Sequence, residues 1–64
     1  MLKQTGIKVK LVGQDGNAFA ILGKVSNALK QAGHHDLAKE FMAEAMSGDY
    51  NHLLQTCTEV VEVV

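Results

Sequence analysis

The chain has 64 residues, 47% hydrophobic and 20% charged, with a formal net charge of −1 at pH 7. This length allows one small domain, residues 1–64, with a thin stability margin, because such a chain buries only about 60% of its unfolded surface. The single cysteine excludes an internal disulfide, and no apolar run approaches the ~18 residues of a membrane span. Residues 1–12 lack the continuous apolar stretch of a signal peptide. We therefore expect a cytoplasmic protein that does not associate with membranes.

Charge is divided unevenly along the chain. Residues 1–32 carry five lysines against one aspartate, a balance of +4, and residues 33–64 carry one lysine against six acidic residues, a balance of −5. In the packing interpretation, the two halves fold together and their charges meet at the rim. The functional alternative is a surface with one basic and one acidic patch. Arginine is absent, which disfavours specific recognition of nucleic acid.

The first predicted element is a strand. Residues 1–6 are expected to be a frayed lead-in. Residues 7–12 alternate between apolar and polar, which predicts a strand with one buried face. Its inward residues are Ile7, Val9 and Leu11, and its outward residues are Lys8 and Lys10. The outward lysines suit an edge strand, where charge discourages unwanted pairing.

Residues 13–16, GQDG, predict a turn. A strand, a glycine turn and a helix N-terminus can together bind phosphate, but this turn lacks both GxxxxGK[ST] and GxGxxG. Asp15 would also place negative charge where the anion should lie. An alternative is that Asp15-Gly16 forms a hairpin followed by a strand at residues 18–22. We favour a simple turn into a helix.

Residues 17–32 predict the amphipathic helix around which the chain is organised. Its apolar residues share one arc, with Phe19 at the edge: Ala18, Ile21, Leu22, Val25, Ala28, Leu29 and Ala32. Asn17 can cap its start, and Gly33 can adopt the left-handed conformation that ends a helix. Gly23 costs about 1 kcal/mol relative to alanine in a helix interior. A close approach by another backbone would explain it.

Two further helices and a strand are predicted. Asp36 is the expected N-cap of a helix at residues 37–46, whose apolar face includes Met46. Asp49 is the expected N-cap of a third helix, which begins at Tyr50 and ends near Cys57 or Thr58. The β-branched residues from Val60 onward predict a strand. Short connections imply antiparallel neighbouring helices.

The fold class we expect is α+β: one small β-α-α-α-β domain whose terminal strands form a two-stranded sheet with helices packed on one face. Val61 and Val63 would face the helices, and Val60, Glu62 and Val64 would share the outer face with Lys8 and Lys10. A lone two-stranded ribbon is marginally stable. We therefore expect a partner, or a second copy of this chain, to cover the outer face or extend an edge.

Two segments carry a resemblance to a known family. VKLVGQDGNAFAILGKVSNALKQAG and EFMAEAMSGDYNHLLQT, within residues 8–62, resemble a family of very small uncharacterised bacterial proteins that are often encoded in phages and conjugative elements. The distinctive parts are VG-x-DGNAF and SGDYNHLLQ. That family has no assigned activity, so the resemblance implies no functional residues. It implies a cytoplasmic accessory protein of a mobile element.

No set of residues predicts catalysis, a metal or a cofactor. His34, His35, His52 and Cys57 are ligand types, but their spacing fits no usual zinc pattern. Cys57 lies on an apolar helix face, where a thiolate is disfavoured. The polar cluster at residues 49–52 is best interpreted as helix capping, with Tyr50 covering the core, although it also permits a contact surface. Glu40 and Glu44 are interpreted as a solvated helix face.

The function we expect is that of a small non-enzymatic protein-interaction or accessory module, acting on an unidentified protein partner or by self-association. The alternative is a weak nucleic-acid-associated accessory protein, based on the lysine-rich first half. The absence of arginine and of exposed stacking aromatics disfavours it. The candidate interaction surface comprises Lys8, Lys10, Asp49, Tyr50, His52, Val60, Glu62 and Val64.

Overall fold

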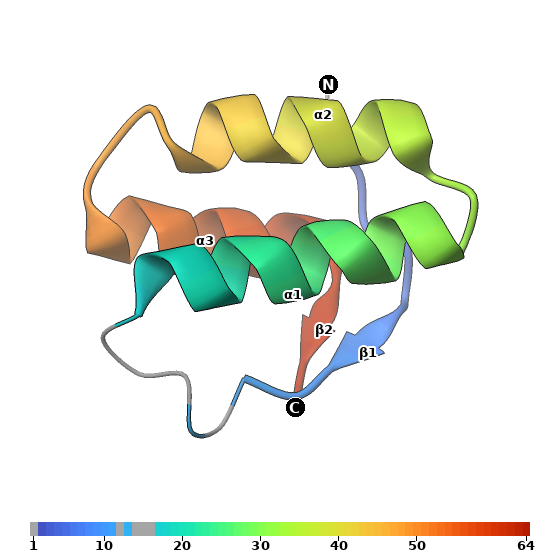
Figure 1. Cartoon of the computed structure of the whole chain (residues 1–64), viewed down its shortest axis with the longest axis horizontal. Coiled ribbons are helices and arrows are strands. Elements are labelled where there is room, and N and C mark those ends of the chain that lie inside the picture. Colours follow the sequence, from blue (N-terminus) through green and yellow to red (C-terminus); the bar gives the residue numbers. More distant parts are fainter. Residues whose placement is uncertain (1, 12, 14–16) are drawn as a thin grey trace.

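Five elements follow one another in the order β1, α1, α2, α3, β2. The computed structural model describes residues 2–11, 13 and 17–64. In it, the elements are β1 (Lys8–Val9), α1 (Ala18–Gln31), α2 (His35–Ala45), α3 (Tyr50–Val60) and β2 (Glu62–Val63) (Figure 1). The predicted α+β class and element order are confirmed. The predicted turn at residues 14–16, Asp15-Gly16 included, lies outside the described residues.

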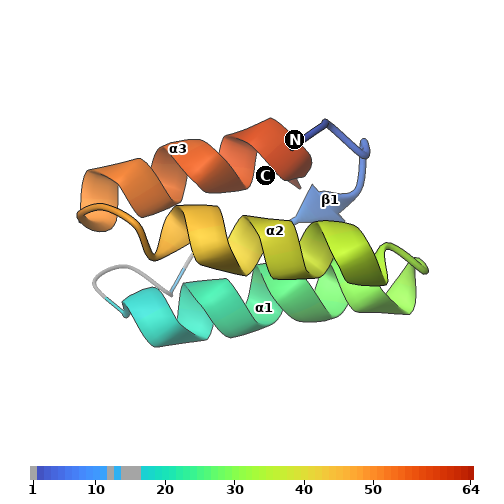
Figure 2. The ribbon, with the colours of Figure 1, turned by 90° about the horizontal axis from the view of Figure 1, so that it is seen from above.

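The three helices form a packed helical layer on one side of the small sheet, and α2 lies farther from the strands than α1 and α3 (Figure 1). Successive helices run antiparallel, and α2 lies over the line between α1 and α3 (Figures 1 and 2). The largest fully buried side chains fill the space beneath α2: Ile21, Val25, Leu29, Phe41, Thr56, Cys57, Val60 and Val61. The core therefore draws on every helix and on the residue that leads into β2.

Helix α1 begins and ends as predicted. The side-chain oxygen of Asn17 accepts a hydrogen bond from the Ala20 N–H at 3.1 Å, which satisfies one of the free donors of the first turn. Gly33 follows the helix with φ +88°, a conformation that a Cβ disfavours. The explanation offered for Gly23 is wrong. A Cβ built there meets no atom within 4 Å from any other described part of the chain, so no neighbouring element in that part requires a glycine.

The start and end of helix α2 differ from the prediction. His34 is its N-cap and makes no side-chain capping bond, and Asp36 lies inside the first turn. A carboxylate there still interacts favourably with the helix dipole, without capping a particular N–H. Met46 follows the last helical residue and is 62% exposed rather than part of the core face, because α2 has already ended.

Helix α3 is longer than predicted. Asp49 caps it as expected, accepting from the His52 N–H at 2.9 Å, but the helix continues to Val60. Val60 is fully buried, so its predicted place on the outer sheet face is wrong. The physical reason is its spacing: it lies seven residues after Leu53 and three after Cys57, on the same helix face. Burial on that face outweighs the preference of valine for strands.

The terminal strands pair in parallel, with Lys8 opposite Glu62 and Val9 opposite Val63. The Glu62 N–H donates to the Ile7 carbonyl at 2.8 Å, and the Val64 N–H donates to the Val9 carbonyl at 3.0 Å. Val63 is 41% exposed instead of facing the core, because the end of β2 projects below the helical layer (Figure 1). The helices cover one face of the sheet, as predicted.

The residues before β1 are held in place, contrary to the expected fraying; Met1 itself lies outside the described residues. The Thr5 N–H and hydroxyl both donate to the Val60 carbonyl, at 2.9 and 2.6 Å. The Gln4 amide donates to the Thr58 carbonyl at 2.8 Å. The last carbonyls of a helix have no partner within the helix itself. Gln4 and Thr5 therefore cap the C-terminal end of α3.

Candidate functional site

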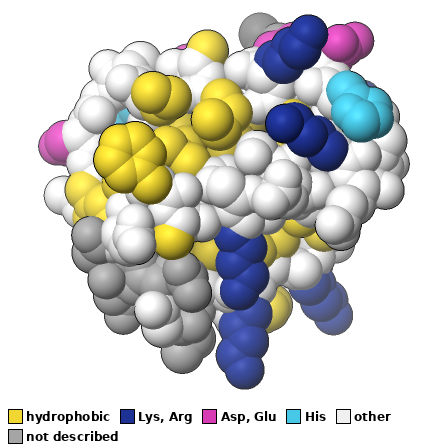
Figure 3. Space-filling model, in the orientation of Figure 1, with side chains coloured by type: hydrophobic (Ala, Val, Ile, Leu, Met, Phe, Trp, Pro, Cys, Tyr) yellow, Lys and Arg dark blue, Asp and Glu magenta, His cyan; other side chains and the backbone are white. Residues whose placement is uncertain are grey.

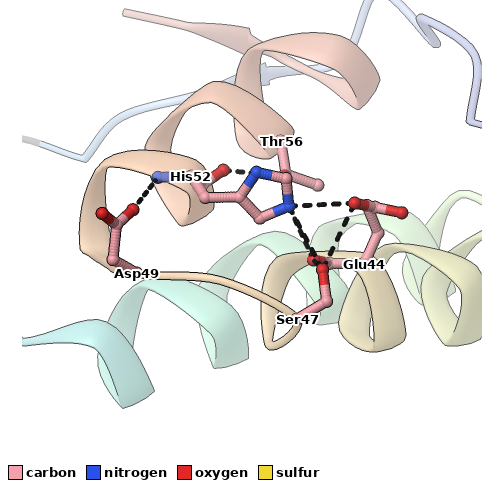
Figure 4. Close-up of polar contacts among 5 residues, drawn as sticks. All are labelled: Glu44, Ser47, Asp49, His52 and Thr56. Atoms are coloured by element: carbon pink, nitrogen blue, oxygen red, sulfur yellow. Dashed lines mark hydrogen bonds and ion pairs between the residues drawn. The ribbon is translucent and has the colours of Figure 1, made fainter.

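The densest polar cluster joins the end of α2 to the start of α3 (Figure 4). His52 points its Nε2 atom back toward α2, 2.9 Å from Glu44 Oε2, 3.0 Å from the Glu44 carbonyl oxygen and 3.3 Å from Ser47 Oγ. The Ser47 hydroxyl also donates to the Glu44 carbonyl at 2.6 Å. Glu44, which the sequence suggested was only solvated, therefore forms an ion pair with His52 whenever the imidazole is protonated.

This geometry does not resemble a catalytic serine–histidine pair. In such a pair one ring nitrogen accepts the hydroxyl proton while the other is oriented by a third group. Here the serine, the carboxylate and the carbonyl all converge on the same Nε2 atom. The Glu44 carboxylate and carbonyl oxygen are both acceptors. The hydrogen-bond network therefore assigns a hydrogen to Nε2, which acts as the donor. The cluster is a joint between two helices.

Gly48 belongs to the same joint. A Cβ built at Gly48 would lie 2.9 Å from the Cβ, Cγ and Cδ2 atoms of His52. The imidazole ring therefore occupies the space that any other residue at position 48 would need. Together with the cap formed by Asp49, this contact gives most residues of the SGDYNH segment a structural role.

The remaining ligand-type residues do not converge. Cys57 is fully buried, and desolvation by burial raises the pKa of its thiol to about 11, against a smaller opposing effect from a backbone hydrogen bond. The thiol is therefore protonated at neutral pH. His34 and His35 lie at the start of α2, at the opposite end of that helix from the contact between His52 and Glu44. Within residues 2–11, 13 and 17–64, no three His, Cys, Asp or Glu side chains are grouped so as to hold a metal.

An apolar groove lies beside the joint, where the first turn of α1 faces the end of α2 and the start of α3. It measures about 240 Å³, and its walls include Phe19, Met46, Asp49 and Tyr50. Phe19 is 82% exposed and Met46 is 62% exposed, while Tyr50 packs partly against the core. Figure 3 shows hydrophobic side chains gathered over this end of the helical layer.

Phe19 and Met46 were missed as surface residues by the sequence reasoning. Asp49 and Tyr50 were named, but Met46 was assigned to the core face of its helix. The available signal was the position of Phe19 at the edge of the apolar arc. An aromatic ring at that edge, in the first turn of a helix, has no further turn to cover it.

A second groove, between β1 and α1, is basic. It measures about 340 Å³ and is lined by Lys8, Lys10 and Lys24, with Asn27 and Gln31 farther along α1. Dark blue lysine side chains project from the lower part of the molecule in Figure 3. Charges of the two halves meet where Lys8 lies opposite Glu62 in the sheet, while in the described part of the chain the ion pair formed is His52–Glu44 and no lysine takes part in one.

The remaining predicted surface residues lie on or near β2. Glu62 and Val64 are exposed, and Val60 is buried. Glu62 lies beside Lys8 in the sheet register, as expected. The predicted surface is thus divided among three places: the helix joint, the basic groove and the end of β2.

Comparison of this chain with protein-family models, curated proteins and solved structures gave no match. None of the helices in the described part of the chain combines the length and apolar character needed to cross a bilayer. The function must therefore be inferred from the surfaces themselves.

Proposed function

We propose that this chain is a small non-enzymatic protein-interaction module that binds its partner through the groove beside Phe19 and Met46. The observation that supports the proposal is the 82% exposure of Phe19. Burying a large aromatic side chain stabilises a fold by roughly 1.5–3 kcal/mol, and the exposed Phe19 does not contribute this. The loss is large for a small domain, whose total stability is low. Aromatic side chains and methionine are enriched at protein interfaces, and aromatic anchors often dominate their binding energy.

The rim of the groove indicates the chemistry of the partner. Asp49 contributes an exposed carboxylate, and no lysine lines the groove. A complementary partner offers an apolar side chain for the groove and a lysine or arginine beside it for Asp49. The lysines of this chain lie on other surfaces, so the charge pattern favours a different protein over a second copy.

In this proposal the module acts in the cytoplasm, which its unpaired cysteine supports. It serves as an accessory protein of a mobile element, which the resemblance of residues 8–62 suggests. The absence of a catalytic arrangement at the helix joint supports a binding role over an enzymatic one.

The experiment is a pulldown from native host lysate with the tagged full chain, in three forms: wild type, Phe19→Ala and Val64→Ala. Val64 is an exposed apolar residue outside the groove and is the matched control. A protein that survives nuclease treatment, binds wild type and Val64→Ala, and is lost with Phe19→Ala would support the proposal. Equal capture by all three forms would contradict the assigned surface.

The mass of the purified chain in solution completes the test. A monomer near the 6.9 kDa of the chain is expected at micromolar concentration. A dimer that dissociates on Phe19→Ala substitution would identify a second copy as the occupant of the groove and would overturn the proposal of a different partner.

A further inference from the structure

We propose that the basic groove between β1 and α1 is a second binding site, and that it binds the phosphate backbone of duplex nucleic acid without reading its sequence. The site is separate from the groove beside Phe19, and the two grooves have no lining residue in common. The inference therefore goes beyond the protein-interaction role and can fail independently of it.

The fold brings together residues that are far apart in the chain. Lys8 and Lys10 come from β1 and the residue after it, and Lys24 comes from the second turn of α1. Asn27 and Gln31 follow Lys24 at three and seven residues along α1, so they continue the same side of the helix. The result is a groove in which three ammonium groups and two carboxamides from two different elements come together.

The charges in this groove are not balanced within the described part of the chain. No described carboxylate lines the groove, and Lys8, Lys10 and Lys24 form no ion pair with any described residue. Carboxylates line a different groove, between α2 and α3, where Glu40, Glu44 and Glu59 are found. Glu62 lies opposite Lys8 in the sheet and offsets part of its charge, so the positive field available to a ligand is centred on Lys10 and Lys24, although the net charge of the chain is −1.

The donor groups favour a phosphate polymer over an acidic protein segment. A phosphodiester backbone bears one charge in each repeat and presents only acceptors, which suits a groove of ammonium and amide donors. A protein segment would also need apolar contacts, and in this groove Val9 is almost fully buried beneath the lysines. No aromatic side chain lines the groove, so it offers no surface on which unpaired bases could stack. Lysine contacts to phosphate carry no sequence information.

The expected salt dependence follows from the number of lysines. Three phosphate contacts give a slope of roughly −2.7 for log K against log salt concentration on B-form DNA. Binding should therefore weaken roughly 40-fold between 50 and 200 mM salt. Each lysine removed should reduce the magnitude of the slope by about 1.

The test is fluorescence anisotropy with a labelled 20-base-pair duplex of arbitrary sequence, titrated with the full chain at several salt concentrations. The variants are Lys24→Gln, Lys10→Gln with Lys24→Gln, and Lys39→Gln. Lys39 is exposed on α2 outside the groove, so its substitution changes the net charge equally and is the matched control. Circular dichroism verifies that each variant is folded. Phe19→Ala should bind the duplex like wild type, which separates this site from the protein-interaction groove.

The proposal is supported if the Lys24→Gln variant loses about 1 from the slope, the double variant loses about 2, and Lys39→Gln matches wild type. It is overturned if the duplex does not bind at 20 mM salt, or if Lys39→Gln weakens binding as much as Lys24→Gln. Tighter binding of the single strand than of the duplex would also overturn it. Competition by polyglutamate at the same charge concentration as duplex would point instead to an acidic protein partner.

Discussion

The joint between α2 and α3 differs from the surface of α1 in whether its side chains have partners within the chain. At the joint, the side chains of Glu44, Ser47, Asp49 and His52 all have partners within the chain. On α1, Phe19 is exposed to water, and Lys24 lies in a groove that no carboxylate of the described residues lines. The joint contains the residue types that are more often catalytic, yet their contacts all serve the fold. Phe19 and Lys24 on α1 are less reactive types, and their exposure has no role in the fold.

A dense polar cluster is therefore a weak indicator of function in a domain this small. Short helices leave free N–H and C=O groups at every connection, and nearby polar side chains are needed to satisfy them. Groups that folding leaves without a partner are better guides. On this basis Phe19 and the lysines of the basic groove rank above His52 as functional residues.

Two glycine-to-alanine substitutions should separate these regions most strongly. Gly48→Ala places a methyl group against the His52 ring and should destabilise the fold by about 2 kcal/mol, because the ring must leave the joint. Gly23→Ala fills open space in a helix interior and should stabilise the fold by about 1 kcal/mol. Urea denaturation measures both. Equal effects of the same sign at the two positions would contradict the account of the joint.

The interior of α3 should show the next largest effect, as a dependence on pH. Burial raises the pKa of the Cys57 thiol to about 11, so above pH 9 the unfolded chain loses this proton more readily than the folded chain. The stability contributed by the protonated thiol is complete below pH 9 and is lost as the pH rises toward 11. The loss should reach about 2 kcal/mol.

The control for this effect is Cys57→Ala, which removes the thiol while lysine titration remains. The stability difference between wild type and the variant should be constant below pH 8 and shrink from pH 9 to 11. A difference that stays constant across that range would show that the thiol is not desolvated.

Loss of the cap at the joint should have a smaller effect. Asp49→Ala removes the acceptor of the His52 N–H and should cost about 1 kcal/mol. Asp49→Ser keeps an acceptor at the same position and should stay within a few tenths of a kcal/mol of wild type. If thermal unfolding showed the serine variant to be as unstable as the alanine variant, the carboxylate would have a role beyond capping.

The smallest expected effect is at Phe19, and it sharpens the comparison most. Phe19→Ala should change the free energy of unfolding by less than about 0.5 kcal/mol, because the ring is exposed and alanine is the better helix former. Phe41→Leu, in the fully buried core, should cost about 1 kcal/mol or more. A large loss of stability with Phe19→Ala would show that the ring stabilises the fold, and this would contradict its assignment as a binding residue.

Much of this architecture could be read from the sequence because local signals agree with the fold. The apolar arc of residues 17–32, the Asn17 and Asp49 caps and Gly33 all predicted what the structure shows. The errors arose where distant contacts decide. Val60 remains helical because its position completes the core. The residues before β1 are ordered because Gln4 and Thr5 donate hydrogen bonds to carbonyls at the end of α3.

The two binding surfaces could be predicted only in part, for a related reason. Lys8 and Lys10 were identified from the alternation of β1, but Lys24 joins them only because α1 packs beside that strand. The parallel orientation of the sheet likewise depends on the path of the chain through three intervening helices, which no local pattern encodes.

The pairing of β1 with β2 has a consequence for biosynthesis. Lys8 and Glu62 are neighbours in the sheet but lie 54 positions apart, so β1 leaves the ribosome roughly 3–10 s before its partner exists. During that interval the apolar side of the strand is unpaired, in the state most prone to aggregate with other nascent chains. Lys8 and Lys10 place charge within that segment, as gatekeeper residues do. The same two lysines can thus protect the strand during synthesis and line the basic groove afterwards.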